Sequence, residues 1–338
     1  MKAYQIKGSF GLQHLALVEL PDPVAAAGEV LVRVRAASIN HRDLLMIKGL
    51  YNPRQKLPLI PCSDGAGEVV AIGTGVSAVK VGDRVCSVFA PGWASGEPTR
   101  SKVSTTLGGP VDGMLTELRS LPEAAVLPLP AHLSFEEGAT LPCAGVTAWR
   151  ALVTEGQVMP GETVLVQGTG GVSLFALQIA KLLGARVIVT SSSDEKLARA
   201  RALGAALCVN YVTQPEWHKE AKDFTAGVGV DHVVDVGGAS TLERSLKAVR
   251  MGGHISVIGV LGGNAGPINL IPILMQHVRM QGVLVGSRED QQGLSRSFAS
   301  QGTKPILDRV FDFGDAVPAF EHMASGKHFG KIVVKIGA

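Results

Sequence analysis

The chain has 338 residues, which is enough for two domains of about 100–200 residues, each with its own core. Hydrophobic residues make up 46% and charged residues 18%, a composition that excludes a largely disordered chain. The formal net charge is only +3, so we expect neither a nucleic-acid partner nor attachment to a membrane surface.

The N-terminal residues and the cysteines indicate the compartment. Residues 1–13 lack the basic-then-apolar pattern of a signal peptide, and no apolar run approaches the ~20 residues that span a bilayer. The four cysteines are widely separated and form no CxxC pair. We therefore expect a cytoplasmic, reduced protein.

Residues 1–126 are predicted to form a β-rich domain. Its alternating or glycine-bounded apolar runs predict strands at Glu29–Ala36, Gly67–Val76 and Arg84–Phe89. The segment Phe89–Gly113 is rich in Gly, Pro and Ser and predicts a long loop, with Trp93 lining a substrate entrance.

Residues 127–286 are predicted to form a doubly wound parallel sheet. Short apolar strands are expected at Thr163–Gln167, Arg186–Thr190, Ala206–Val209, His232–Val236, Ile255–Gly259 and Val283–Gly286. Helices are expected between them at Val172–Leu183, Asp194–Leu203, Trp217–Phe224 and Thr241–Val249. This alternation is typical of a six-stranded dinucleotide-binding sheet covered on both faces. Residues 287–338 end in the strand Lys331–Ile336 and are expected to return to the first domain.

A glycine-rich turn follows the first of these strands. It consists of Gly168, Thr169, Gly170, Gly171, Val172 and Ser173, with serine in place of the third glycine of GxGxxG. Because it stands between a strand and a helix, we expect it to hold a cofactor pyrophosphate at the helix N-terminus.

The end of the second strand selects the dinucleotide. A cofactor without a 2′-phosphate usually meets an acid at this position, whereas here Ser191 and Ser192 are followed by Lys196. Hydroxyls and a cation suit a phosphate, so we predict NADP(H). The nearest acid, Asp194, is expected to cap the following helix.

An ordered set of motifs resembles the medium-chain dehydrogenase/reductase superfamily over essentially the whole chain. The motifs are Ser38–Asp43, Pro61–Glu68, Gly82–Val85, Leu141–Ala148, the glycine turn and Gly330–Val334. The resemblance implies an α/β fold with a GroES-like β-rich catalytic domain, interrupted by a Rossmann domain with a six-stranded parallel sheet. It also implies an active site between the two.

The resemblance bears on zinc as well. The superfamily's zinc alcohol dehydrogenases bind catalytic zinc through a Cys, a His–Glu pair and a second Cys, whose positions are Asn40, Ser63–Asp64 and Cys143 here. An amide, a hydroxyl and one thiol form a poor zinc set, so we expect no metal. A rearranged site of His41, Cys62, Asp64 and Cys143 is the alternative.

Without zinc, the chain resembles the quinone oxidoreductase-like branch, whose quinone and enoyl reductases carry a similar Asn…Asp…Gly–x–Tyr pattern. Here the pattern falls on Asn40, Asp43 and Tyr51, which are the candidate catalytic residues. Tyr51 is the matching proton donor, and the Asn40 amide would stabilise an enolate. The alternatives are a loop aromatic for Tyr51, a turn amide for Asn40 and a capping or buried, paired acid for Asp43.

The resemblance assigns further cofactor contacts. It implies a pyrophosphate contact for His41, a nicotinamide contact for Thr147 and an adenosine contact for Tyr211. It also places near the nicotinamide ribose and carboxamide a set made up of Gly259, Val260, Leu261, Val285, Gly286 and Ser287. Lys331 and Arg288 are expected to reach phosphates or to form surface salt bridges.

The leading functional hypothesis is an NADPH-dependent, zinc-independent reductase of activated alkenes or quinones, acting on a small hydrophobic substrate. One alternative is an NAD(P)-dependent alcohol dehydrogenase or carbonyl reductase; another is a cofactor-binding protein with little catalysis. The superfamily often pairs its sixth Rossmann strand across a two-fold axis, so a homodimer is expected. The apolar residues 268–286 suit either its interface or a buried core strand.

Overall fold

The computed structural model describes residues 1–337, which divide into two compact units. The first unit comprises residues 1–146 and 286–338, and the second comprises residues 147–285. The sequence-based boundary at 126 thus differs by twenty residues, because the helical segments after β7 (Val126–Pro128) still pack with the first unit. The C-terminal segment clusters with the first unit.

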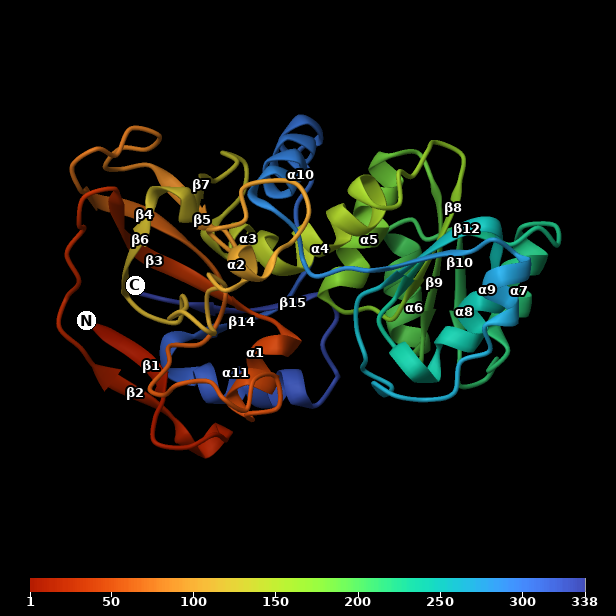
Figure 1. Ribbon diagram of the computed structural model, residues 1–338, viewed down its shortest axis with the longest axis horizontal. Coiled ribbons are helices and arrows are strands. Elements are labelled where there is room, and N and C mark those ends of the chain that lie inside the picture. The colour runs from red at the N-terminus through yellow and green to blue at the C-terminus, as the bar shows by residue number, and fades with distance from the viewer. Residues whose placement is uncertain (338) are drawn as a thin grey trace. The chain divides into compact units, whose positions relative to one another are not determined.

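The first unit is built on a seven-stranded mixed sheet, whose main path runs β14-β15-β3-β4-β5-β7 with β6 paired to β3 (Figure 1). Its strands are β3 (Glu29–Ile39), β4 (Asp64–Ile72), β5 (Arg84–Ser87), β6 (Leu118–Pro122), β7, β14 (Leu307–Asp312) and β15 (Lys331–Lys335). A separate hairpin pairs β1 (Lys2–Ile6) with β2 (Leu15–Glu19). The helices are α1 (His41–Ile47), α2 (Arg100–Val103), α3 (Phe135–Gly138), α10 (Arg288–Gln301) and α11 (Ala316–Ala324).

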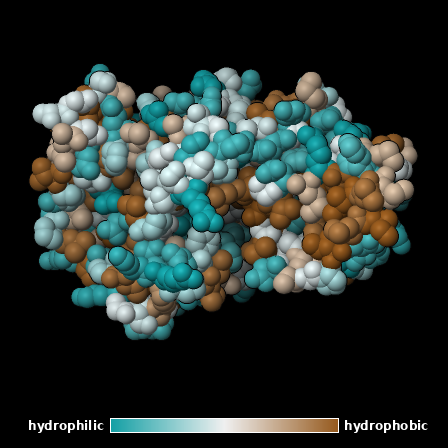
Figure 2. All heavy atoms as spheres, viewed as in Figure 1, coloured by the Kyte–Doolittle hydropathy of each residue, from teal (hydrophilic) through white to brown (hydrophobic). Residues whose placement is uncertain are grey.

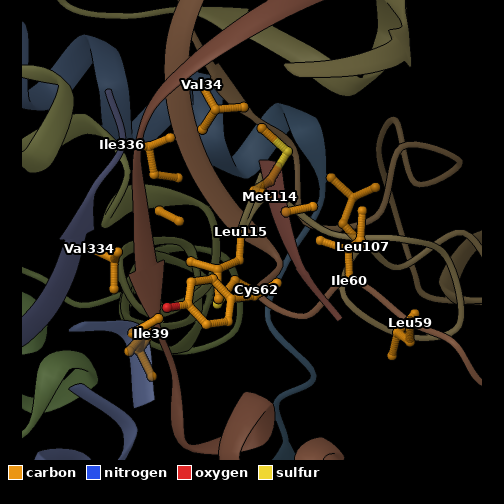
Figure 3. Packing of buried hydrophobic residues seen from close by; sticks show 14 of the residues in the cluster. Val34, Ile39, Leu59, Ile60, Cys62, Leu107, Met114, Leu115, Val334 and Ile336 are labelled. Carbon is orange, nitrogen blue, oxygen red and sulfur yellow. The ribbon is translucent and has the colours of Figure 1, made fainter. Parts of the chain in front are cut away.

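The burial of its side chains suits β3 to a place in the middle of this sheet. Its side chains alternate between buried and less buried along EVLVRVRA, and the last four residues are all buried. The core beneath it gathers Val34, Ile39, Met114, Leu115 and Val334 around one apolar cluster (Figure 3). The catalytic candidates follow β3 directly, so this core fixes their starting point.

The second unit is a six-stranded parallel sheet in the order β10-β9-β8-β11-β12-β13. Its strands are β8 (Thr163–Gln167), β9 (Arg186–Ser191), β10 (Leu207–Asn210), β11 (Val230–Asp235), β12 (Val249–Val257) and β13 (Arg279–Gly282). Its helices are α5 (Gly171–Leu182), α6 (Asp194–Ala202), α7 (Trp217–Phe224), α8 (Leu242–Ala248) and α9 (Ile271–Met275), while α4 (Val146–Trp149) lies at the boundary. In sequence order the strands lie 3-2-1-4-5-6, the doubly wound arrangement. Right-handed crossovers place α5 and α6 on one face and α7 and α8 on the other.

The predicted α/β fold is confirmed, with two corrections in the second unit. The sixth strand is Arg279–Gly282 instead of Val283–Gly286, because Arg279 to Gly282 pair in register with His254 to Val257. The fifth strand ends at Val257, two residues earlier than expected. Among the described residues, no helix is long and apolar enough to cross a membrane.

Candidate functional site

In the first unit, the chain turns from β3 into α1 at Asn40. The Asn40 backbone is extended, with φ −120° and ψ 157°, and its N–H donates to Asp43 Oδ2 at 2.9 Å. Asp43 is fully buried and accepts a second hydrogen bond from Arg42 Nη1 at 3.1 Å. Burial raises the pKa of Asp43, and the Arg42 charge opposes this shift. Asp43 therefore both caps the helix and pairs with a cation, while His41 remains exposed.

Lys331 comes to the same point from the far end of the chain. The neighbouring pair Ile332 and Ile39 is in register between β15 and β3. The Lys331 side chain is buried, and its Nζ donates to the Ile39 carbonyl at 2.9 Å and to Asn40 Oδ1. These two hydrogen bonds hold the ammonium beside Asn40, and the expected phosphate contact of Lys331 stays a prediction.

Asp64, the first residue of β4, completes the arrangement. Ser63 Oγ donates to its Oδ1 at 2.6 Å, and the Cys143 backbone N–H donates to its Oδ2 at 3.2 Å. Burial raises the pKa of Asp64 to about 6, and the Lys331 ammonium is the main opposing influence. We call Arg42, Asp43, Asp64 and Lys331 the buried ionic cluster; it holds two cations and two acids.

Tyr51 lies at the surface side of this cluster. The residue is 44% exposed, and the Arg42 guanidinium carbon is 5.0 Å from the ring centroid. Sequence reasoning missed Arg42. Its partners are backbone carbonyls and aromatic rings, which leave no pattern in the sequence. Trp93, expected at a substrate entrance, is instead buried, with its indole N–H bonded to the Gly96 carbonyl.

The four positions that correspond to zinc ligands are engaged in other contacts. Asn40 Oδ1 accepts from the Lys331 ammonium, and the Ser63 hydroxyl donates to Asp64. Burial raises the pKa of the Cys143 thiol, and the backbone N–H of this residue donates to Asp64. Across residues 1–337 no group of three or more His, Cys, Asp or Glu is arranged to hold a metal ion. This donor set does not fit zinc.

In the second unit, the glycine turn opens α5. Gly168 has φ +74°, a backbone conformation that glycine adopts without strain, and Gly170 is the N-cap of the twelve-residue helix. No side chain caps this N-terminus. Ser173, at the third glycine position, is buried and donates to the Gln167 carbonyl at 2.7 Å. The turn therefore has the geometry that accepts a pyrophosphate on backbone N–H groups.

At the end of β9, the predicted phosphate side chains gather at one helix start. Ser193, not Asp194 as expected, caps α6 by accepting from the Lys196 backbone N–H, and Ser191 Oγ accepts from the Ser193 N–H. Ser192 is exposed and Lys196 is partly exposed. The nearest acid, Asp194, accepts the Asn210 amide at 2.8 Å.

The predicted cofactor contacts that follow β10 and β12 lie in loops. Tyr211 follows β10 directly, is exposed, and donates its backbone N–H to the Ser191 carbonyl. Gly259, Val260 and Leu261 leave the sheet after Val257, and the Gly259 N–H reaches back to the Asp235 carbonyl.

The remaining predicted contacts lie near the ends of the two units. Thr147 is buried at the start of the second unit. Val285, the last residue of that unit, has φ +50°. Gly286 and Ser287 begin the next segment of the first unit, where Ser287 caps α10 in a capping box with Asp290.

A buried polar network at the end of β8 and β11 was not predicted. Gln167 Nε2 donates to Asp235 Oδ2 at 3.0 Å, and Ser245 Oγ donates to the same oxygen at 2.6 Å. Asp235 Oδ1 accepts from the backbone N–H groups of Gly237 and Gly238 and from the Thr241 hydroxyl. Asp235 thus fixes the loop that follows β11, beside the glycine turn.

Comparisons with known proteins agree with these two units. A zinc-binding dehydrogenase family model matches residues 171–300, and an alcohol dehydrogenase GroES-like domain model matches residues 26–131. A zinc-type alcohol dehydrogenase-like protein of Schizosaccharomyces pombe is 44% identical over 315 residues, 91% of each chain. The crystal structure of an NAD-dependent alcohol dehydrogenase superposes with a TM-score of 0.92 at 35% identity and covers 100% of both chains.

More distant matches have other activities in their names. An acryloyl-coenzyme A reductase of Metallosphaera sedula is 29% identical and 99% of each chain is covered. A quinone oxidoreductase structure from Coxiella burnetii has a TM-score of 0.81 at 29% identity, covering 100% of this chain and 99% of that one. A mycobacterial structure complexed with NADPH has a TM-score of 0.83 at 26% identity, covering 99% of both. By sequence and by fold, the chain belongs to the medium-chain dehydrogenase/reductase superfamily.

Proposed function

We propose that this oxidoreductase uses NADPH, without zinc, to reduce activated alkenes such as enones and 2-alkenals, or quinones. The observation that carries the proposal is the buried ionic cluster, which engages the zinc-ligand positions in hydrogen bonds and lies beside an exposed phenol. The acryloyl-coenzyme A reductase and quinone oxidoreductase relatives support this class of substrate.

The residues of the first unit suit charge that develops on a conjugated oxygen. When bound, the nicotinamide supplies a hydride to the β-carbon of the substrate. The Asn40 amide is buried, with its Oδ1 held by Lys331 and its side chain bonded to the Asp64 carboxylate, and its Nδ2 is the donor that we propose for an enolate oxygen. Tyr51 presents a phenol that protonates the resulting carbon or oxygen. Asp43 holds Asn40 and Arg42 in place and is a positioning residue.

The Tyr51→Phe variant tests this assignment. We expect its kcat for an enone to fall by about 10²-fold, the usual contribution of a positioned general acid, with the Kd for NADPH unchanged. The matched control is Tyr4→Phe, which removes the phenol hydroxyl that donates to the Gly314 carbonyl. An unchanged kcat in Tyr51→Phe would show that another group delivers the proton.

An alcohol dehydrogenase or carbonyl reductase is the second candidate, because relatives with 44% and 35% identity have alcohol dehydrogenase names. Product analysis separates the two. With NADPH deuterated at nicotinamide C4 and an enone, our proposal places deuterium on the β-carbon of a saturated ketone. Deuterium on the carbinol carbon of an allylic alcohol would favour the second candidate.

The proposed preference for NADP(H) rests on the end of β9. The 2′-phosphate would be held by Ser191, Ser192 and Lys196, while the Asp194 carboxylate is held by Asn210. We expect Lys196→Glu to weaken NADPH binding about 10- to 100-fold and to leave NADH binding nearly unchanged, because only the 2′-phosphate meets the new charge. Fluorescence titrations measure the Kd of both cofactors. The control is Lys219→Glu, which changes an exposed lysine on α7. Equal losses for both cofactors would contradict the assignment.

We also propose a homodimer formed through β13 and α9. β13 ends the strand order and leaves one edge unpaired in the described sheet. Apolar side chains gather over α9 (Figure 2), among them Leu270, Ile271, Leu274 and Met275, with Leu274 78% exposed. We expect Leu274→Asp to convert the dimer to a monomer in sedimentation velocity, whereas Val228→Asp, at an exposed turn, leaves it dimeric. A monomeric parent protein would contradict this interface.

A further inference from the structure

The phenol of Tyr51 lies in a loop that offers it little support of its own. Tyr51 follows α1, and its backbone N–H donates to the Leu45 carbonyl at 3.2 Å. The residue is exposed, and the guanidinium carbon of Arg42 lies 5.0 Å from the centroid of its ring. The position of the ring therefore depends on how firmly Arg42 is held.

Arg42 is held from several sides. Nη1 donates to the Leu107 carbonyl at 3.1 Å and Nη2 to the Gly109 carbonyl at 3.0 Å, while Nη1 also bonds Asp43. The guanidinium carbon lies 5.2 Å from the centroid of the Phe89 ring as well. The side chain is 8% exposed. The guanidinium is thus a fixed, planar surface beneath the Tyr51 ring.

The two carbonyls that hold Arg42 come from a tightly packed turn. Gly108 has φ +68°, and a Cβ there would lie 2.8 Å from the Cys62 carbonyl carbon. Gly109 has φ +124°, and a Cβ there would lie 2.3 Å from the Met46 methyl group. Because backbone and core side chains confine this turn, its carbonyls are fixed acceptors for the guanidinium.

We propose that Arg42 is the positioning residue for Tyr51: it fixes the phenol ring over its guanidinium and links that ring to the end of the segment 89–113. The catalytic part of this inference rests on the proposed function of Tyr51. Arginine suits this role better than lysine, because its planar fork bonds two carbonyls while its flat face carries an aromatic ring.

The chain offers a direct probe of the ring, because it contains only three tyrosines: Tyr4, Tyr51 and Tyr211. Protein labelled with 3-fluorotyrosine should give three ¹⁹F resonances, and Tyr51→Phe identifies the one from residue 51. In Arg42→Lys, which keeps the charge, we expect that resonance to narrow and move toward the position of free fluorotyrosine. The other two resonances stay in place and report that the fold is intact.

Two further variants keep the test decisive. Arg54→Lys changes an exposed arginine near Tyr51 and should leave all three resonances unchanged. If Arg42→Lys does not fold, Phe89→Leu removes the second ring contact of the guanidinium and should move the residue-51 resonance in the same direction by less. A residue-51 resonance unchanged in the folded variant overturns the proposal.

Kinetics separate this inference from the proposed function. We expect Arg42→Lys to lower kcat for an enone by about 10- to 100-fold with little change in KM, as misplacement of a catalytic group does. In a Tyr51→Phe background the same change should cost nothing further. Equal losses in both backgrounds would show that Arg42 does not act through Tyr51. If the parent enzyme reduces no enone or quinone, the proposed function fails while the ¹⁹F measurement still tests the positioning.

Discussion

Replacing Lys331 with methionine is expected to lower the free energy of unfolding by about 3–5 kcal/mol, the usual cost of removing one partner from a buried ionic network. The ammonium is 3% exposed, bonds Ile39 and Asn40, and is a main charge that opposes the raised pKa values of Asp43 and Asp64. Methionine matches its length but leaves two buried acids with one cation. Urea unfolding, followed by the fluorescence of buried Trp93 in the same unit, measures the loss.

The pH dependence of this variant has a definite sign. Burial already raises the pKa of Asp64 to about 6 in the folded protein, above its unfolded value of about 3.9. Without Lys331 that folded pKa rises further. The folded state then binds more protons than the unfolded state up to a higher pH, so its stability keeps falling as pH rises. We therefore expect the deficit of Lys331→Met to be larger at pH 8 than at pH 6.

Lys335 provides the matched control. It lies on the same strand, β15, but its side chain is exposed. Lys335→Met should change the free energy of unfolding by no more than about 0.5 kcal/mol. A Lys331→Met variant as stable as Lys335→Met at pH 8 would show that the buried ionic cluster does not need this cation.

The second large effect is expected at Asp235, in the nucleotide-binding unit. Asp235→Ala removes the acceptor for five donors: the Gln167 amide, the Ser245 and Thr241 hydroxyls, and two backbone N–H groups. An unsatisfied buried donor costs about 1–3 kcal/mol, and several of these keep other partners or can reach water. We expect a loss of about 3–4 kcal/mol in the free energy of unfolding.

The same substitution is expected to weaken cofactor binding. Asp235 holds the loop at Gly237 and Gly238 at the carboxyl end of β11, the edge where dinucleotides bind in such sheets. We expect the Kd for NADPH to rise at least about tenfold in the folded variant. Asp223→Ala, at an exposed position of the same unit, is the control. A variant with parental stability and affinity would show that this network is dispensable.

The local sequence pattern was enough to predict most strands and helices of the second unit. The bounds Thr163–Gln167 and Trp217–Phe224 agree with the structure residue for residue, because apolar runs and helical periodicity are local properties. The error at the sixth strand arose because Val283–Gly286 is the more apolar segment. Arg279–Gly282 forms the strand because it pairs with β12, and this pairing depends on tertiary structure.

The candidate site was less predictable, for a physical reason. Lys331 and Asn40 are 291 residues apart, and Gln167 and Asp235 are 68 apart, so their contacts depend on strand register. The contacts of Arg42 leave no periodic pattern in the sequence, because its partners are backbone carbonyls and the faces of aromatic rings. In contrast, the capping box of Asn40 and Asp43 is local, and the sequence offered a capping role for Asp43 as an alternative to a catalytic one.

One measurement tests the central claim of a zinc-independent NADPH reductase most directly. The zinc content of purified protein is determined by elemental analysis, and the same preparation is assayed, before and after treatment with a chelator, for NADPH oxidation with a panel of enones and quinones. We predict zinc far below one atom per chain, with turnover that neither the chelator nor added zinc changes. Zinc near one per chain, with activity lost to the chelator and restored by zinc, would contradict the claim.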